Sequence, residues 1–217
     1  MKLHTVVISY QRLDLTKQAV ASYLETVSVP YTLMVMDNGS SQKVTDWILG
    51  NAHNFRYILL GENKYPGFAC NRGFERAADN ATVFHRADND WRFLPGWCEE
   101  VERCLEANPR LGQLGLRTGE QELHNTHNVG GNCVFRREVY DQGLRYDERP
   151  WPKIKPDGYT EDSYMSPAVT RLGWEWGRVE NPCIESLANE DPADDYYLRS
   201  WEDRGILEQA KKAYGIE

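Results

Sequence analysis

Hydrophobic residues in the first half of the chain alternate between two spacings. Short apolar, β-branched runs, typical of buried strands, precede stretches whose apolar residues recur every three or four positions, as on one face of a helix. The expected strands cover residues 2–9, 31–37, 55–60 and 81–87, and the expected helices cover about 14–26, 44–49 and 67–78. Such alternation predicts parallel strands joined by right-handed crossovers. We therefore expect an α/β fold with a Rossmann-like, mostly parallel central sheet flanked by helices.

The second half of the chain is less regular. Residues 111–118 and 130–136 resemble further strands, and residues 161–172 read as a helix with an acidic start. The amphipathic tail from Asp194 onward favours a helix, and Asp14 is the expected N-cap of the first helix. Residues 145–160 contain three prolines and several charges, which predicts a long loop that would suit a lid. No internal repeat or linker interrupts the pattern, so residues 1–217 are expected to form a single domain.

Composition adds few constraints. Hydrophobic residues make up 41% and charged residues 27%, a globular balance. The net charge of −8 argues mildly against broad electrostatic capture of nucleic acid or of an anionic membrane, but is compatible with a local basic groove. No run approaches the ~20 apolar residues of a membrane helix, and the first apolar stretch is too short for a signal peptide. The five cysteines show neither metal nor redox spacing, so we expect reduced thiols, no integral membrane segment and a cytoplasmic protein.

Polar motifs stand where the first two strands end. Ser9–Arg12 follows the first strand and Asp37–Ser40 follows the second. Ligands of open α/β sheets bind at the carboxyl ends of the strands, where an acidic residue can accept hydrogen bonds from a ribose. Asp-Asn-Gly-Ser is also a sequence that favours turns, so a turn that simply ends the strand is an alternative explanation of the second motif.

The segment 62–77 is rich in glycine and asparagine. Gly67 and Gly73 would let the backbone approach a ligand, and the amides of Asn63 and Asn71 supply directional hydrogen bonds. The alternative is an ordinary loop and helix start with incidental glycines.

Two acidic pairs suggest chemistry. Asp88 and Asp90 flank one residue at the end of an apolar strand, and such close carboxylates favour a cation such as Mg²⁺ or Mn²⁺. A solvated turn is the alternative. Glu161 and Asp162 begin the expected helix, where complementing the helix macrodipole is a sufficient reason for acidic residues.

In this order the motifs resemble those of the family-2 glycosyltransferases, which have the GT-A fold. The likeness covers about residues 3–190. The family's strand-end turn matches Ser9, Tyr10, Gln11 and Arg12; its Asp-Asn-Gly-Ser matches Asp37, Asn38, Gly39 and Ser40; its Asn-x-Gly loop matches Asn63, Gly67, Asn71 and Gly73; its Asp-X-Asp matches Asp88 and Asp90; its Gly-Asn segment includes Asn132; and its acidic pair matches Glu161 and Asp162.

The resemblance implies a metal-dependent, inverting transfer of a sugar from a nucleotide diphosphate donor, most commonly a uridine diphosphate sugar, to an acceptor hydroxyl. Residues 1–95 would form the donor-binding half and residues 96–217 the acceptor-binding half. Asp162 would be the catalytic base, and Asp90, with Asp88 nearby, would bind Mn²⁺ or Mg²⁺. The residues expected to bind substrates are Ser9, Tyr10, Arg12, Asp37, Asn38, Asn63, Gly67, Asn71, Asp88, Asn132 and Glu161.

The chain departs from the family pattern at one position. Many relatives have a further metal-binding histidine after the last strand, whereas this chain has Ser186 there. Glu185 or His127 could substitute, or Asp90, phosphates and water could hold the metal without them.

The acceptor and the type of reaction each have more than one candidate. Relatives of this size act on glycans, on small soluble acceptors or on hydroxymethylated DNA bases, and the sequence does not choose between them. A nucleotidyltransferase is a second hypothesis, but residues 9–17 lack its glycine-rich basic signature. A catalytically degenerate nucleotide-sugar-binding module is a third, motivated by the missing histidine. The oligomeric state is left open.

Overall fold

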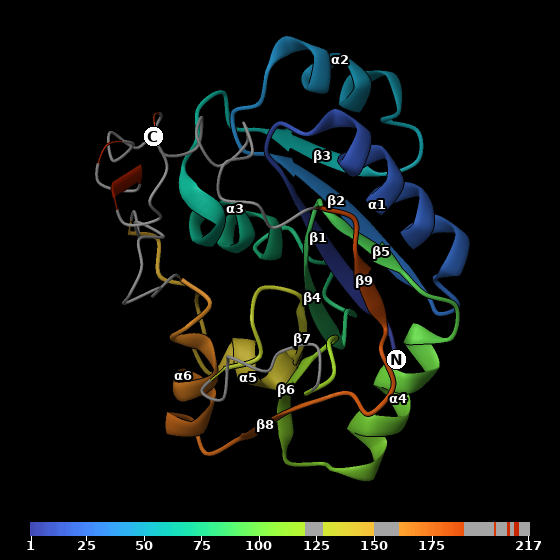
Figure 1. Ribbon diagram of the computed structural model, residues 1–217. Coiled ribbons are helices and arrows are strands. Elements are labelled where there is room, and N and C mark those ends of the chain that lie inside the picture. Colours follow the sequence, from blue (N-terminus) through green and yellow to red (C-terminus); the bar gives the residue numbers. More distant parts are fainter. Residues whose placement is uncertain (120–127, 150–160, 189–201, 203–207, 209–210, 213–217) are drawn as a thin grey trace.

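The computed structural model describes residues 1–119, 128–149 and 161–188, together with residues 202, 208, 211 and 212 (Figure 1). A seven-stranded sheet in the order β3-β2-β1-β4-β7-β6-β8 forms its centre. The strands of this sheet are β1 (Leu3–Ser9), β2 (Tyr31–Asp37), β3 (Arg56–Leu59), β4 (Val83–Asp88), β6 (Leu111–Gly115), β7 (Cys133–Arg136) and β8 (Glu175–Arg178). Only β7 runs antiparallel to its neighbours in this sheet, so the expected mostly parallel α/β fold is confirmed.

Helices cover both faces of the sheet. They are α1 (Leu13–Thr26), α2 (Gln42–Gly50), α3 (Tyr65–Phe74), α4 (Trp97–Ala107), α5 (Arg137–Asp141) and α6 (Met165–Arg171). Side chains from α1, α2 and α4 share one core with the sheet, whereas α3, α5 and α6 contribute to a second core. A small antiparallel pair, β5 (Trp91–Phe93) with β9 (Ile184–Ser186), lies on the first of these faces. The result is a sandwich of helix, sheet and helix layers (Figure 1).

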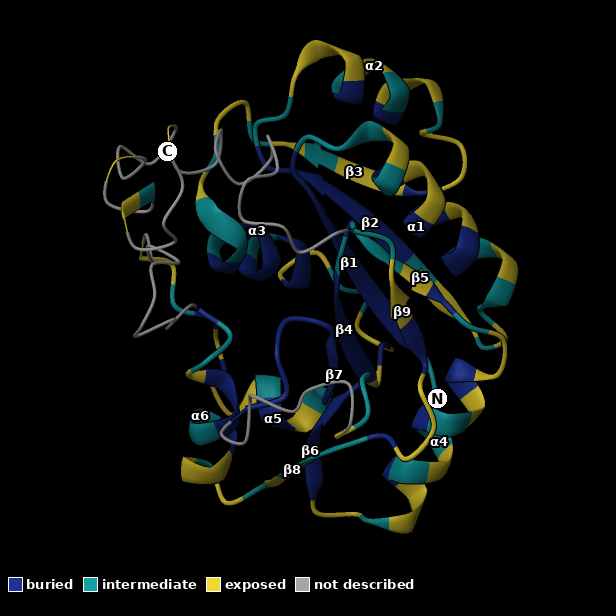
Figure 2. Cartoon of the chain, in the orientation of Figure 1, coloured by how far each residue is buried: buried dark blue, intermediate teal, exposed yellow. Residues whose placement is uncertain are grey.

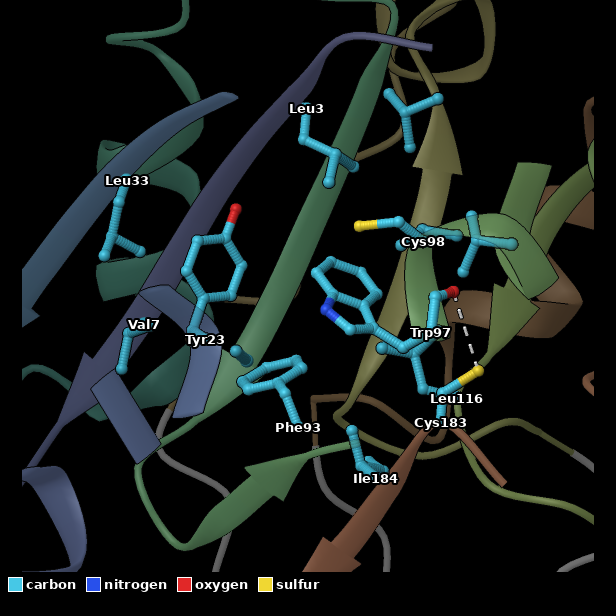
Figure 3. Close-up of a cluster of buried hydrophobic side chains, with 14 of the residues drawn as sticks. Leu3, Val7, Tyr23, Leu33, Phe93, Trp97, Cys98, Leu116, Cys183 and Ile184 are labelled. Atoms are coloured by element: carbon cyan, nitrogen blue, oxygen red, sulfur yellow. Dashed lines mark hydrogen bonds between the residues drawn. The ribbon is translucent and has the colours of Figure 1, made fainter. Parts of the chain in front are cut away.

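The central strand β1 contributes to both cores because successive side chains of a strand point to opposite faces. Leu3 and Val7 belong to the first core, and Val6 and Ile8 belong to the second. Figure 3 shows the first core, in which aromatic residues from α1, β5 and α4 pack together with Leu3 and Val7. All of β1 is buried, and the helices show buried stripes toward the sheet in Figure 2. The sequence periodicity in the first half thus reflects real packing faces.

Three expected element boundaries are wrong. The first helix begins at Leu13 with Arg12 as its N-cap, and Asp14 is an exposed residue of the first turn rather than the cap. The third helix spans Tyr65–Phe74, earlier than expected, and Ala77 then donates to the Phe74 carbonyl in a tight turn. Residues 161–164 form a turn and α6 begins only at Met165, and the Glu161 side chain of this turn contacts the buried Arg86.

No element is predicted between the fourth strand and residue 111, yet β5 and α4 lie there. Trp97, Val101 and Leu105 of α4 are buried at helical spacing, so the signal was present. Strands β8 and β9 were also missed, and both are short. Most of the expected tail helix from Asp194, the residues 150–160 of the expected lid, and His127 lie outside the described residues; the described tail residues 202, 208, 211 and 212 are helical.

All five cysteines are free thiols, as expected. Four are buried and Cys104 is half-buried. Within the described residues, no helix combines the length and the apolar character that crossing a bilayer requires.

Two histidines are buried in the sheet, and they make the fold sensitive to acid. His85 Nδ1 lies 3.1 Å from Thr5 Oγ1, and burial lowers the pKa of His85 to about 3. Burial also lowers the pKa of His4. The unfolded chain takes up a proton near the ordinary pKa of 6.5 while the folded chain does not, so stability is lost as the pH falls below that value. We expect His85 alone to cost about 2 kcal/mol of unfolding free energy at pH 5 relative to pH 7.

Urea unfolding followed by circular dichroism at both pH values measures this loss. The variant His85→Gln should lose less stability than the wild type between pH 7 and pH 5, whatever its stability at pH 7. The control His53→Gln, which removes an exposed imidazole, should keep the wild-type difference. An unchanged difference in His85→Gln would contradict the assignment.

Candidate active site

Three of the predicted motifs meet at the carboxyl ends of neighbouring strands. Ser9 at the end of β1 is in register with Asp37 at the end of β2. On the other side of β1, Ile8 is in register with Asp88 at the end of β4. We call this edge of the sheet, with the loops that follow β1, β2 and β4, the acidic rim.

The loop after β1 is tightly held. Ser9 and Tyr10 are buried, and the Ser9 carbonyl accepts a hydrogen bond from Asn38 N at 2.8 Å. Gln11 and Arg12 both have positive φ angles, 52° and 49°, which are unusual for residues with side chains. Gln11 N donates to Ser40 Oγ at 2.9 Å, so the first and second motifs support each other.

Asp37 begins the second loop and is 2% exposed. It accepts a hydrogen bond from Ser40 N at 3.3 Å, and burial raises its pKa. Gly39 has a φ of 80°, and a side chain there would meet the Glu62 carbonyl carbon at 2.3 Å. The motif therefore makes the tight turn that its composition suggests, and it also places a buried carboxylate at the rim.

Two asparagine side chains join the loops that follow β2 and β3. Asn38 Nδ2 donates to Asn63 Oδ1 at 3.1 Å, and Asn38 Oδ1 accepts from Lys64 N at 2.9 Å. Asn63 Oδ1 also accepts from Tyr65 N at 3.0 Å. Both amides thus fix the loop backbones, and direct contacts of these residues with a donor stay a prediction.

Gly67 and Asn71 of α3 hold another segment of the chain. A side chain at Gly67 would collide with the Asp147 carbonyl oxygen at 2.1 Å and would lie 3.3 Å from Glu161 Cβ. Asn71 donates to the Tyr146 carbonyl at 2.9 Å and accepts from Tyr146 N at 3.0 Å. The close approach expected of Gly67 is therefore made by the protein's own backbone. A direct role of Gly67 or Asn71 in donor binding stays a prediction.

Arg86, which none of the predicted motifs includes, links the two acidic pairs. Its side chain is 4% exposed, and Nη2 lies 2.7 Å from Glu161 Oε1 and 3.3 Å from Asp88 Oδ1. Burial by itself lowers the pKa of Arg86, but the carboxylates of Asp88 and Glu161 outweigh this and raise it well above its usual range. The guanidinium also lies 4.9 Å from the centre of the Tyr146 ring. A signal was available in the sequence: an arginine inside an apolar strand, two residues before Asp88 and hence on the same face.

The Gly-Asn segment also holds Asp88. Asn132 Oδ1 accepts from Asp88 N at 2.9 Å. A side chain at Gly131 would meet Asp88 Oδ2 at 2.5 Å and Arg86 Nη2 at 3.1 Å. The glycine therefore leaves the room that this half-buried ion pair needs. A direct role of Asn132 in substrate binding stays a prediction.

Asp90 pairs with Arg12 across the rim. Arg12 Nη1 donates to Asp90 Oδ2 at 3.0 Å, and the side chains are 9% and 23% exposed. Asp90 O accepts from Leu187 N at 2.8 Å, which ties the Asp-X-Asp motif to the end of β9.

The position of the expected histidine lies on this small β5–β9 ribbon. Ser186 stands opposite Trp91, and Ser186 Oγ donates to the Ala188 carbonyl at 3.0 Å. Glu185 stands opposite Arg92 and pairs with it at 2.9 Å. Because neighbouring residues of a strand alternate in direction, Glu185 points to the other face of the ribbon from Ser186. Because it pairs with Arg92, Glu185 is already engaged with another side chain.

Asp162 is the chain neighbour of Glu161, which contacts Arg86. It lies in the turn 161–164, in which Met165 N donates to the Asp162 carbonyl at 3.1 Å. Its charge contributes to the raised pKa of Arg86. The contact between Arg86 and Glu161, which are 75 positions apart, therefore links the turn that carries Asp162 to the strand that ends in Asp88, and the role of Asp162 as the base stays a prediction.

The rim suits a metal that is only partly held by protein. The side chains of Asp88 and Asp90 are 32% and 23% exposed, and their oxygens are the ligands that Mg²⁺ and Mn²⁺ prefer. In the part of the chain that the structure describes, no group of three or more His, Cys, Asp or Glu side chains could enclose an ion. These residues fit an ion that completes its shell with phosphate oxygens and water, which is common for Mg²⁺.

A surface pocket of about 330 Å³ lies at the other end of the strands. Its lining includes Met1 and Val83, which precede or begin β1 and β4, together with Glu102 and Arg136. None of the predicted site residues contributes to it.

Solved structures with the same architecture are glycosyltransferases. Mannosyltransferase PcManGT from Pyrobaculum calidifontis, in complex with GDP-Man and Mn²⁺, superposes with a TM-score of 0.66 at 15% identity, covering 99% of this chain and 64% of that one. TarS 1–349 from S. aureus gives 0.68 at 13% identity, with coverages of 95% and 63%. The same TarS fragment in complex with UDP-GlcNAc gives 0.66 at 14% identity, with coverages of 99% and 72%. The chain thus spans less than two thirds of the first two proteins, and identities this low establish the fold, which is GT-A.

The sequence profile of the glycosyl transferase family 2 matches residues 5–121, more than half of the chain. The chain therefore belongs to glycosyl transferase family 2. A search of curated proteins finds no match.

Proposed function

We propose that this protein transfers a sugar from a nucleoside diphosphate sugar to an acceptor hydroxyl, with inversion at the anomeric carbon. The observation that carries the proposal is the Arg86 bridge, 2.7 Å to Glu161 and 3.3 Å to Asp88. It supports the proposal because it links the turn that carries the expected base, Asp162, to the strand that ends in Asp88. Family membership and the GT-A fold support the same reaction class.

The nucleoside would bind at the ends of β1 and β2. The buried carboxylate of Asp37 would accept hydrogen bonds from the ribose, and Ser9 and Tyr10 would contact the base. Structural neighbours bind UDP, UDP-GlcNAc or GDP-Man, so uridine and guanosine diphosphate sugars are the donors to test first. We favour a uridine diphosphate sugar, on the family resemblance.

Asp90 and Asp88 would hold Mn²⁺ or Mg²⁺ together with the two donor phosphates. The bound ion would act as a Lewis acid that neutralises the charge developing on the departing diphosphate. The PcManGT structure contains Mn²⁺, which supports the use of a divalent ion.

Asp162 would accept the proton of the acceptor hydroxyl as the hydroxyl oxygen bonds to the anomeric carbon. On the opposite side of that carbon, the bond to the diphosphate oxygen breaks and the diphosphate leaves with the electron pair. Attack opposite to the leaving group inverts the anomeric centre. The acceptor would be a glycan, a small molecule or a hydroxymethylated DNA base.

The metal assignment predicts the behaviour of Asp90→Ala. Isothermal titration calorimetry with UDP and with GDP, with and without Mn²⁺, should show that Mn²⁺ tightens nucleotide binding in the wild type. In Asp90→Ala this increase should disappear because the ion loses its main protein ligand. Asp46→Ala is the control, since Asp46 is an exposed residue of α2 that pairs only locally with Gln42. Retention of the full Mn²⁺ effect in Asp90→Ala would refute the assignment.

A further inference from the structure

Arg12 stands at a position that disfavours arginine in three ways. Its φ of 49° lies in the left-handed region, which costs a residue with a side chain of order 1 kcal/mol or more. It is the N-cap of the 14-residue helix α1 and makes no capping hydrogen bond with its side chain. Its positive charge also lies at the positive end of the helix macrodipole. Local structure alone therefore does not explain an arginine here.

The surrounding residues hold Arg12 in this conformation. Thr16 N and Thr16 Oγ1 both donate to the Arg12 carbonyl, at 3.0 Å and 3.2 Å. Asn89 Nδ2, from within the Asp-X-Asp motif, donates to Thr16 Oγ1 at 2.7 Å. Asn89 and Thr16 are both buried. The loop is thus fixed against the very motif that Arg12 contacts.

The Arg12 guanidinium is the cation that lies on Asp90, the carboxylate proposed to bind the metal. Nη1 lies 3.0 Å from Asp90 Oδ2. A divalent ion at the same carboxylate would lie within a few ångströms of the guanidinium, and like charges at that distance repel strongly in a partly desolvated site. The two cations therefore compete for Asp90.

We propose that Arg12 is a diphosphate-binding residue that Asp90 holds until a divalent cation replaces it, whereupon the guanidinium turns to the donor phosphates. This inference rests on the proposed function. Guanidinium groups bind phosphates through paired hydrogen bonds, and the amino end of a long helix adds further attraction for an anion. Arg12 thus neutralises Asp90 in the empty site and one of the phosphates in the loaded site.

The proposal predicts opposite effects of Arg12→Gln on two affinities. Without nucleotide, Mn²⁺ should bind about fivefold more tightly than to the wild type because its competitor is gone. With saturating Mn²⁺, UDP, or GDP if UDP does not bind, should bind about tenfold more weakly because a charged hydrogen-bond donor is lost. Electron paramagnetic resonance of free Mn²⁺ measures the first affinity and calorimetry the second. Arg12→Lys keeps a cation on Asp90 and should leave the Mn²⁺ affinity near the wild-type value. This variant tests the competition even if the glutamine variant does not fold.

The control is Arg92→Gln, which removes the same charge two residues beyond Asp90, from an exposed pair with Glu185. It should change neither affinity. If Arg12→Gln weakens both ligands, or changes neither, Arg12 is not a competitor and the inference is overturned. A tightening of Mn²⁺ in Arg12→Lys equal to that in the glutamine variant would also overturn it. If Asp90→Ala leaves Mn²⁺ binding intact, the metal assignment itself fails, and this inference fails with it.

Discussion

Replacing Arg86 by methionine should lower the free energy of unfolding by about 3–5 kcal/mol, because removal of one partner leaves a buried charge without compensation. Arg86 and Glu161 are 4% and 8% exposed at their side chains and lie 2.7 Å apart. Methionine fills much of the arginine volume, so the loss reports mainly on the charge. Urea unfolding followed by circular dichroism measures it.

Two further variants separate the buried charge from other effects. Arg92→Met breaks the exposed pair with Glu185 and should cost less than about 1 kcal/mol. The double variant Arg86→Met with Glu161→Met removes both buried charges and should recover most of the lost stability, since a buried pair is often replaceable by apolar residues. Its turnover should stay low, because the link between Asp88 and the turn that carries Asp162 is gone. If Arg86→Met alone were as stable as the wild type, the stabilising role assigned to the Arg86–Glu161 pair would be contradicted.

The first half of the fold could be predicted from the sequence because its signals are local. Strands β1, β2 and β4 are buried on both faces and therefore appear as continuous apolar runs. Helix α2 shows its apolar face at helical spacing. The carboxyl ends of parallel strands must meet at one edge, so the meeting of Asp37 and Asp88 follows from the strand order.

The second half depends on contacts between distant residues, which a single sequence does not display. Residues 161–164 form a turn rather than the expected helix start, and Glu161 pairs there with Arg86 of the distant strand β4. Gly67 was interpreted as a place for ligand approach, whereas the approaching group is the Asp147 carbonyl. Strand β9 is three residues long and is defined by pairing with β5 rather than by its own pattern.

The partners of the acidic residues could not be predicted from the sequence either. The Asp-X-Asp motif suggested a cation, but not that arginines already neutralise it. Asp88 lies against Arg86 and Asp90 against Arg12, at 3.3 Å and 3.0 Å. Arg12 precedes the motif by almost 80 residues, and only the sheet order brings them together. The electrostatics of the rim therefore emerge from the fold.

Replacing Asp162 by asparagine should lower kcat by about 10²- to 10⁴-fold, the usual contribution of a general base. Asparagine keeps the size and most hydrogen bonds of the side chain but cannot take the acceptor proton. Affinity for the nucleotide with Mn²⁺ should stay close to that of the wild type, since Asp37 and Asp90 are unchanged. Turnover is measured by nucleotide release with a glycan or hydroxymethylated DNA acceptor, and affinity by calorimetry.

The matched control is Asp147→Asn, the same substitution at a residue whose carbonyl lies against Gly67. Asp147 pairs with Arg149 at 2.9 Å, and its loss should change kcat only a few-fold because it has no proton to accept. A general base and a merely structural carboxylate differ in a second way. If Asp162 only supported the turn, Asp162→Asn would lower the free energy of unfolding and the nucleotide affinity together with kcat. A loss of kcat alone is the signature of a group that acts on the reacting proton, and wild-type turnover in this variant would remove Asp162 from that role.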